Sequence, residues 1–223
     1  MIPTDCQSFM SKQSPSGALL IFTKAPVLGR VKTRLIPGIG RRRATSVYLD
    51  LLTRTLGTAR KARFSSIQIW VGGELEHSYF SRLKNRHAVK IYKQQGKELG
   101  QRMSNAFDTA LRRHPYAVLI GSDCPSLACS DLIASARCLE DKADVVLGPA
   151  VDGGYYLIGL SKNNKQIFSK IKWGKQNVFK DTCTNIKTLD WKLSLLSKRW
   201  DVDRTADLLP FFKLKRTDSV LYY

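Results

Sequence analysis

The fold is decided near the amino end by residues 18–35, which read ALLIFTKAPVLGRVKTRL. The first five of these residues are all apolar, which is typical of a strand buried on both faces, as in the parallel sheets of α/β proteins. A basic loop that contains Gly29 follows this run. From Ala44 to Ala59 the apolar side chains recur every three or four residues, so the sequence predicts an amphipathic helix after the loop.

Strands and helices alternate along much of the remaining chain. The same spacing predicts a helix after Gly100 that ends at His114 and Pro115, and another that Ser130 or Asp131 caps. Short apolar runs predict strands at 67–71, 89–93, 117–120, 144–147 and 155–160. This alternation implies right-handed crossovers, so we expect one Rossmann-like α/β domain with a mainly parallel central sheet and helices on both faces.

In such a sheet, ligands bind at the carboxyl ends of the strands. Three loops that follow predicted strands should meet at this edge, namely 23–40, 121–125 and 149–154. We therefore expect the functional site among these loops.

Length and composition restrict the class of protein. The chain has 223 residues, 43% of them hydrophobic, so one packed domain is expected, and a coiled coil or wholesale disorder is excluded. No apolar run approaches the roughly 20 residues that span a bilayer. The first residues are rich in Ser, Gln and Pro, so we expect a flexible segment at 1–17 and a folded domain at 18–223. Five cysteines without a Cys-x-x-Cys pair indicate reduced thiols in a cytoplasm.

The charge is strongly basic, and it is unevenly distributed. The formal net charge is +19; residues 24–63 contain eleven basic residues and one acidic residue, whereas residues 124–160 are locally acidic. A basic stripe raises the possibility of nucleic-acid binding. However, the only aromatic residue in 24–63 is Tyr48, which lies on the apolar face of the predicted helix, whereas single-strand binders interleave rings with cations. Nucleic acid is therefore not the partner that the sequence favours.

The loop after the first strand has the composition of a polyphosphate-binding loop. Lysine acts on phosphate as a point charge and arginine offers a fork of donors, so the four cations could together neutralise a di- or triphosphate. The loop matches neither the Walker loop nor the dinucleotide fingerprint. The residues concerned are the cations Lys24, Arg30, Lys32 and Arg34, with Gly29 for a close approach and Thr33 as a hydroxyl donor.

Several motifs in order resemble one family. The loop KAPVLGRVKTRL at 24–35 resembles that of a bacterial glycosyltransferase-like family, associated in some members with arsenosugar biosynthesis, and is also similar to that of phospholactate guanylyltransferases. GKELGQRM at 96–103, GSDCP at 121–125 and DGGYYLIG at 152–159 resemble later motifs of the family. In the segments at 173–175 and 201–208, Lys175 stands where Thr is expected, and Arg204-Thr205 where Thr-Pro is expected.

The resemblance implies the GT-A fold of the nucleotide-diphospho-sugar transferase superfamily, with Mg²⁺ or Mn²⁺ as cofactor. Asp123 follows a buried strand, where a carboxylate is costly unless it is paired, caps a helix or binds a cation. The resemblance implies that Asp123 coordinates the metal and that Asp203 completes the site. It also places Asp152, Gly153, Gly154 and Tyr155 beside the donor sugar or the acceptor, whereas a Gly-Gly hairpin turn is the alternative for this segment. Arg102 is expected near the base or the phosphates.

Three functions follow from this interpretation. The leading one is glycosyl transfer from a nucleotide-diphosphate sugar to a small-molecule acceptor, with Asp123 and Asp152 as catalytic residues. The second is nucleotidyl transfer, in which a phosphorylated acceptor attacks a nucleoside triphosphate and pyrophosphate leaves; the cation density at 24–34 favours this chemistry. The third is a catalytically inactive module that binds a nucleotide or another polyanion.

Overall fold

A computed structural model describes residues 14–86 and 89–220. Its strands form one seven-stranded sheet in the order β3-β2-β1-β4-β6-β5-β7. The strands are β1 (Ala18–Lys24), β2 (Ser66–Gly72), β3 (Lys90–Lys93), β4 (Ala117–Ile120), β5 (Val145–Pro149), β6 (Tyr155–Leu160) and β7 (Leu193–Leu195). All neighbouring pairs are parallel except those that involve β6, which runs antiparallel to β4 and β5. The prediction of an α/β fold with a mainly parallel sheet is confirmed.

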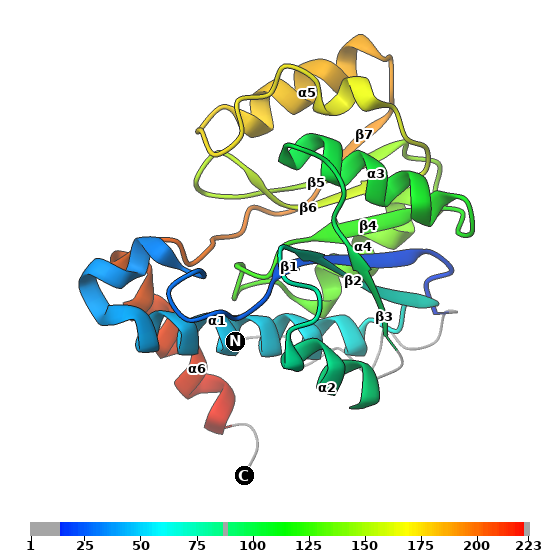
Figure 1. The fold of residues 1–223 in the computed structure, drawn as a ribbon. Coiled ribbons are helices and arrows are strands. Elements are labelled where there is room, and N and C mark those ends of the chain that lie inside the picture. The colour runs from blue at the N-terminus through cyan, green and yellow to red at the C-terminus, as the bar shows by residue number, and fades with distance from the viewer. Residues whose placement is uncertain (1–13, 87–88, 221–223) are drawn as a thin grey trace.

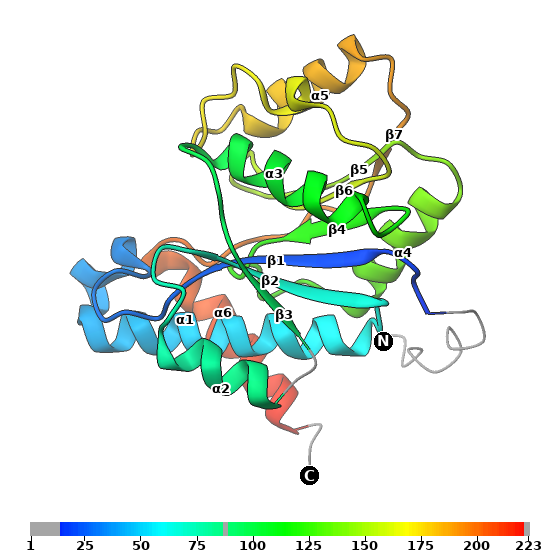
Figure 2. The same cartoon turned by 45° about the vertical axis from the view of Figure 1, so that its right-hand side comes forward.

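Helices cover both faces of this sheet (Figure 1). The helices are α1 (Ile36–Lys61), α2 (Ser78–Arg86), α3 (Leu99–Leu111), α4 (Cys129–Glu140), α5 (Val178–Thr188) and α6 (Leu208–Val220), with short 3-10 turns at Thr33–Leu35, Lys165–Phe168 and Thr205–Asp207. The two sides of the sheet can be followed again in Figure 2, where α3 and α5 lie on one side and α1 and α2 on the other.

Strand β1 shows why both faces are covered. Its side chains alternate: Leu19 and Ile21 pack against α1, α2 and α4, whereas Leu20 and Phe22 pack against α3. All four side chains are buried, and burying a Leu, Ile or Phe side chain contributes roughly 1.5–3 kcal/mol. The continuous apolar run of the sequence therefore corresponds to a strand with a hydrophobic core on each side.

A third, smaller cluster joins the carboxyl-terminal segment to α1. Leu35 and Val47, near and within α1, pack with Val202 and with Phe211 from α6. This contact brings the segment 196–204, which leaves β7, back across the sheet to the loop that follows β1 (Figure 1).

The helix boundaries differ in places from the sequence prediction. Helix α1 begins at Ile36 rather than at Ala44, and Gly40 lies inside it with a left-handed φ of 76°, which marks a kink. Helix α4 is not capped by Ser130 or Asp131. Its N-cap residue is Ala128, and Asp131 at the third helical position accepts a hydrogen bond of 2.9 Å from the Ala128 backbone N–H.

Residues 1–13 of the expected flexible segment 1–17 lie outside the described part of the chain. Residues 14–17 are described, and Pro15 and Gly17 are buried. The Ser65 backbone N–H donates to the Pro15 carbonyl at 2.9 Å, so this end of the segment is held against the body of the domain. Among the described residues, no helix has the combination of length and hydropathy that crossing a membrane requires.

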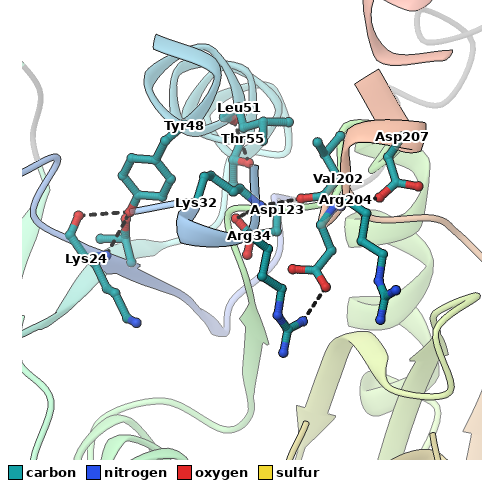
Figure 3. A network of polar contacts seen from close by, with 12 residues as sticks. Lys24, Lys32, Arg34, Tyr48, Leu51, Thr55, Asp123, Val202, Arg204 and Asp207 are labelled. Carbon is teal, nitrogen blue, oxygen red and sulfur yellow. Dashed lines mark hydrogen bonds and ion pairs between the residues drawn. The ribbon is translucent and has the colours of Figure 1, made fainter. Parts of the chain in front are cut away.

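The polar group that fixes the end of β1 is the Tyr48 hydroxyl of α1. It lies 2.6 Å from the Thr23 hydroxyl, accepts from the Lys24 backbone N–H at 2.8 Å and lies 2.9 Å from the Lys24 carbonyl. Burial raises the pKa of this phenol, so it stays neutral and acts only through hydrogen bonds. Tyr48 thus fixes the point where the chain leaves the sheet and the basic loop begins (Figure 3).

We predict that Tyr48→Phe destabilises the fold by about 1–3 kcal/mol, because several buried or half-buried polar groups lose their partner. Urea unfolding followed by circular dichroism measures this. Tyr92→Phe is the matched control, because the Tyr92 ring stacks on Trp70 while its hydroxyl makes no hydrogen bond to a described residue. Equal stability of the two variants would contradict the role given to Tyr48.

Candidate active site

Two clefts open at the edge of the sheet where β1 and β4 end. The first cleft has a volume of about 600 Å³, and most of the polar side chains predicted from the sequence line it. They are Lys24, Arg30, Lys32, Thr33, Arg34, Arg102, Asp123 and Asp203. Parallel strands place the loops that follow them at one edge, so residues almost 180 positions apart in the sequence share this cleft.

The second cleft, of about 580 Å³, lies beside the first. The two clefts share Phe22, Arg34, Leu99, Gly121 and Asp203 as lining residues. The rest of the second cleft has an apolar and aromatic wall with charged side chains, and includes Asp152, Gly154, Tyr155, Trp173, Lys175 and Arg204. A molecule that fills one cleft is therefore in reach of a molecule that fills the other.

Two predicted glycines do not line these clefts. Gly29 has a left-handed φ of 78° and faces the Arg41 side chain. Gly153 also has a left-handed φ, 89°, and a Cβ on it would lie 2.0 Å from the Gln176 carbonyl oxygen. Both glycines therefore act outside the clefts. Their left-handed backbone conformation and close packing set the course of the loops that line the clefts.

The basic loop is anchored by apolar side chains. Val31 and Leu35 are buried, while Arg30 and Arg34 are exposed at the surface of the cleft. Lys32 has an unusual left-handed backbone conformation, with φ 46° and ψ 43°. The two buried apolar side chains attach the loop to the core, and the exposed Arg30 and Arg34 line the first cleft.

Each of three cations in this loop is paired with a carboxylate. Lys32 Nζ lies 2.8 Å from Asp123 Oδ1 and donates to the Val202 carbonyl. Arg34 forms an ion pair with Asp203. Arg30 pairs with Glu74 at 2.7 Å, and this pair is exposed on both sides.

Arg102, at the start of α3, is positioned by the turn before the helix. Its Nε donates to the Gly96 carbonyl at 2.9 Å, and its guanidinium also reaches the Lys97 carbonyl at 3.4 Å. These hydrogen bonds hold the side chain against the turn, where it lines the first cleft.

Asp152 lies in the connection between β5 and β6. Its Oδ1 accepts from the Gly154 backbone N–H at 2.9 Å, and the Ala150 N–H donates to the Gly154 carbonyl at 3.0 Å. The segment is therefore a tight turn between antiparallel strands, as the hairpin alternative proposed, and at the same time it forms part of the second cleft.

One carboxylate of this region, Asp201, was not predicted from the sequence. Its Oδ1 is buried and has no hydrogen-bond partner among the described residues. Burial, and then the nearby charges of Asp123 and Asp152, raise the pKa of Asp201 to about 7, while Lys32 lowers it in part. The neighbouring Cys124 is also buried, and burial raises the pKa of its thiol to about 12, which agrees with an inert side chain.

The oxygen ligands at this edge fit a divalent cation that is shared with a nucleotide. Within residues 14–86 and 89–220 there is no cluster of three or more His, Cys, Asp or Glu side chains that could hold a metal alone. Mg²⁺ usually binds through one or two carboxylates together with substrate phosphate oxygens and water. Asp123 and Asp203, on the wall of a cleft that five cationic side chains also line, are carboxylates that could hold such a cation.

Comparison with solved structures assigns the fold to a class. A protein from Desulfovibrio desulfuricans, assigned provisionally as a nucleotide-diphospho-sugar transferase, has 26% sequence identity and a TM-score of 0.81, with 92% of this chain and 96% of that chain covered. CMP:2-keto-3-deoxy-manno-octonic acid synthetase, solved with CTP, has 9% identity and a TM-score of 0.59 over 91% of this chain and all of the other. The fold is thus the one found in nucleotide-diphospho-sugar transferases and nucleotidyltransferases.

The sequence also assigns the chain to a family. The model of the family DUF2064, described as uncharacterized proteins conserved in bacteria, matches residues 55–175, and the chain belongs to this family. The fold is shared with Rv0371c from Mycobacterium tuberculosis in its complex with manganese, at 17% identity and a TM-score of 0.53 over 89% of this chain and 98% of the other. The sequence matches none of the curated proteins with which it was compared.

We predict that Asp201→Asn stabilises the metal-free protein, and that the gain depends on pH. A carboxyl whose pKa rises from 3.8 in the unfolded chain to about 7 in the fold favours folding below pH 4, and this contribution is lost as the pH rises to 7. The amide does not titrate. The melting temperature of the variant should therefore exceed that of the wild type by a few degrees at pH 8 and converge with it at pH 4, in buffer with EDTA. A difference that is independent of pH would contradict the buried carboxyl.

Proposed function

We propose that this chain is a metal-dependent nucleotidyltransferase, which joins the nucleotidyl part of a nucleoside triphosphate to a small phosphorylated acceptor. The observation that carries this proposal is the convergence of five cationic side chains with the Asp123 carboxylate in one cleft. Such a set suits a triphosphate, because a triphosphate needs more neutralisation than a diphosphate. The cations are Lys24, Arg30, Lys32, Arg34 and Arg102.

Each of the two clefts would bind one of the two substrates. The triphosphate occupies the first cleft, with Lys24, Arg30 and Arg34 on its phosphate oxygens and Arg102 near its base or its phosphates. The Thr33 hydroxyl, also on this wall, donates to a phosphate oxygen. The acceptor occupies the second cleft beside Asp152 and Tyr155. Because the clefts share a wall, an acceptor oxygen can approach the α-phosphorus of the nucleotide.

In the reaction, an acceptor phosphate oxygen forms a bond to the α-phosphorus, and the bond between this phosphorus and the bridging oxygen of the β-phosphate breaks. The electron pair leaves with pyrophosphate. The basic loop stabilises the charge on that leaving group, since preorganised cations act most strongly where charge develops. A divalent cation, when bound at Asp123 and Asp203, would neutralise further phosphate charge and align the phosphates.

Glycosyl transfer is the second candidate, and the protein from Desulfovibrio desulfuricans is the observation in its favour. In this case the first cleft would bind the diphosphate of a nucleotide sugar, and the sugar would extend into the second cleft. Asp152 would then accept the proton of the acceptor hydroxyl that attacks the anomeric carbon. Trp173, in the wall of the same cleft, offers an apolar face for a sugar ring.

We predict that the purified protein with Mg²⁺ releases pyrophosphate from at least one nucleoside triphosphate when a set of sugar phosphates is supplied. Asp123→Asn should lower this rate by roughly a hundredfold or more, because the site would lose a ligand for the divalent cation that neutralises the phosphate charge. Asp141→Asn is the control, since Asp141 ends α4 and lines neither cleft. A coupled pyrophosphate assay measures the rates.

The same assay separates the alternatives. Turnover of nucleotide sugars without pyrophosphate release would reject nucleotidyl transfer in favour of glycosyl transfer. Nucleotide binding without turnover of either kind of donor would favour the inactive module.

A further inference from the structure

Lys32 differs from the other cations of the first cleft in its burial. Its side chain is 5% exposed, against 73% for Arg30 and 62% for Arg34. An ammonium that is withdrawn from water must be paired, and Lys32 is held by Asp123 and by the Val202 carbonyl. It therefore does not point freely into the cleft as a phosphate ligand would.

The backbone at Lys32 is also held in a sparsely populated conformation. A left-handed φ of 46° is uncommon for lysine and persists only where the surroundings impose it. The bonds to Asp123 and Val202 hold the side chain, while the Lys32 carbonyl accepts from the Leu35 backbone N–H at 2.9 Å.

The carboxylates that suit a metal are those that the loop cations neutralise. Asp123 is 53% exposed toward the cleft and is paired with Lys32, and Asp203 is 44% exposed and is paired with Arg34. Figure 3 shows Lys32 beside Asp123, and Arg34 on the same loop as Lys32. A cation that binds these carboxylates from solution meets the positive charge of both side chains first, and like charges repel.

We propose that Lys32 and Arg34 are placeholder cations, which occupy Asp123 and Asp203 in the free protein and move to phosphate oxygens when a divalent metal arrives with the nucleotide. This inference rests on the proposed nucleotide site. The affinity of this site for a divalent metal is then low without nucleotide and higher with it. The reason is that only the phosphates offer the two displaced cations a new partner. Lys32 is a positioning residue for Asp123 before the exchange and a phosphate ligand after it.

The test uses Mn²⁺ alone, without nucleotide, and measures binding by the loss of the free-ion electron paramagnetic resonance signal. We expect weak binding to the wild type, binding tighter by roughly fivefold or more in Lys32→Met, and a smaller gain of about twofold in Arg34→Met, as the removal of one ion pair allows. Arg30→Met is the matched control, because Arg30 lines the same cleft but pairs with Glu74. It should leave Mn²⁺ binding unchanged.

Two further variants make the result specific. In Asp123→Asn the carboxylate is gone, so adding Lys32→Met to it should give no gain in Mn²⁺ affinity. Because Lys32 is buried and its loss could impair folding, Arg34→Met, whose side chain is exposed, provides an independent measurement. A titration with a nucleoside triphosphate in the presence of Mg²⁺ should show weaker nucleotide binding in Lys32→Met than in the wild type, because the exchanged ammonium is then missing from the phosphates.

Equal Mn²⁺ affinity in the wild type, Lys32→Met and Arg34→Met would overturn the proposal. A gain in Arg30→Met as large as that in Lys32→Met would also overturn it, because it would show a general effect of net charge. Since no turnover is measured, these outcomes do not depend on whether the protein transfers nucleotidyl or glycosyl groups.

Discussion

The ammonium of Lys32 connects three segments that are far apart in the sequence. It joins the loop after β1 to Asp123, which follows β4, and to Val202, which lies 170 residues away. The Val202 N–H in turn donates to the Asp123 carbonyl at 2.9 Å. A buried charge tolerates few arrangements, because an unpaired ion in the interior costs several kcal/mol. The contacts of one ammonium therefore join three segments that line or adjoin the first cleft, and a change at Lys32 affects all three.

Much of the fold could be predicted because its strongest signals are local. The apolar run of β1 and the periodic faces of α1 and α3 mark elements whose burial decides their type. The direction of β6 is different: an apolar run predicts a strand but not its orientation. The connection 150–154 is too short for the crossover that parallel strands require, and this was the available signal for an antiparallel pair. Helices α2, α5 and α6 and the three-residue strand β7 were not predicted.

The candidate site could be predicted in part for a related reason. Strand ends locate the basic loop and Asp123, and the parallel sheet brings them to one cleft. The pairing of Lys32 with Asp123 could not be predicted, because each residue alone suits a ligand and only the tertiary arrangement places them 2.8 Å apart. Asp203 was predicted as a site residue and Asp201 was not. The sequence shows two similar carboxylates, but it does not show that Asp201 is buried. The second cleft combines the motif at 152–159 with residues 173–178, with Asp203 and Arg204, and with side chains from β1, α3 and β4, and the sequence does not show that these segments meet.

The central claim is that a nucleotide phosphate chain is bound between the basic loop and Asp123. The most direct measurement is a crystal structure with Mn²⁺ and a non-hydrolysable nucleoside triphosphate, in which anomalous scattering locates the metal. We expect the triphosphate in the first cleft, in contact with Lys24 and Arg34, and the manganese at Asp123. A triphosphate bound elsewhere, with the contact between Lys32 and Asp123 intact and no manganese beside it, would contradict the claim.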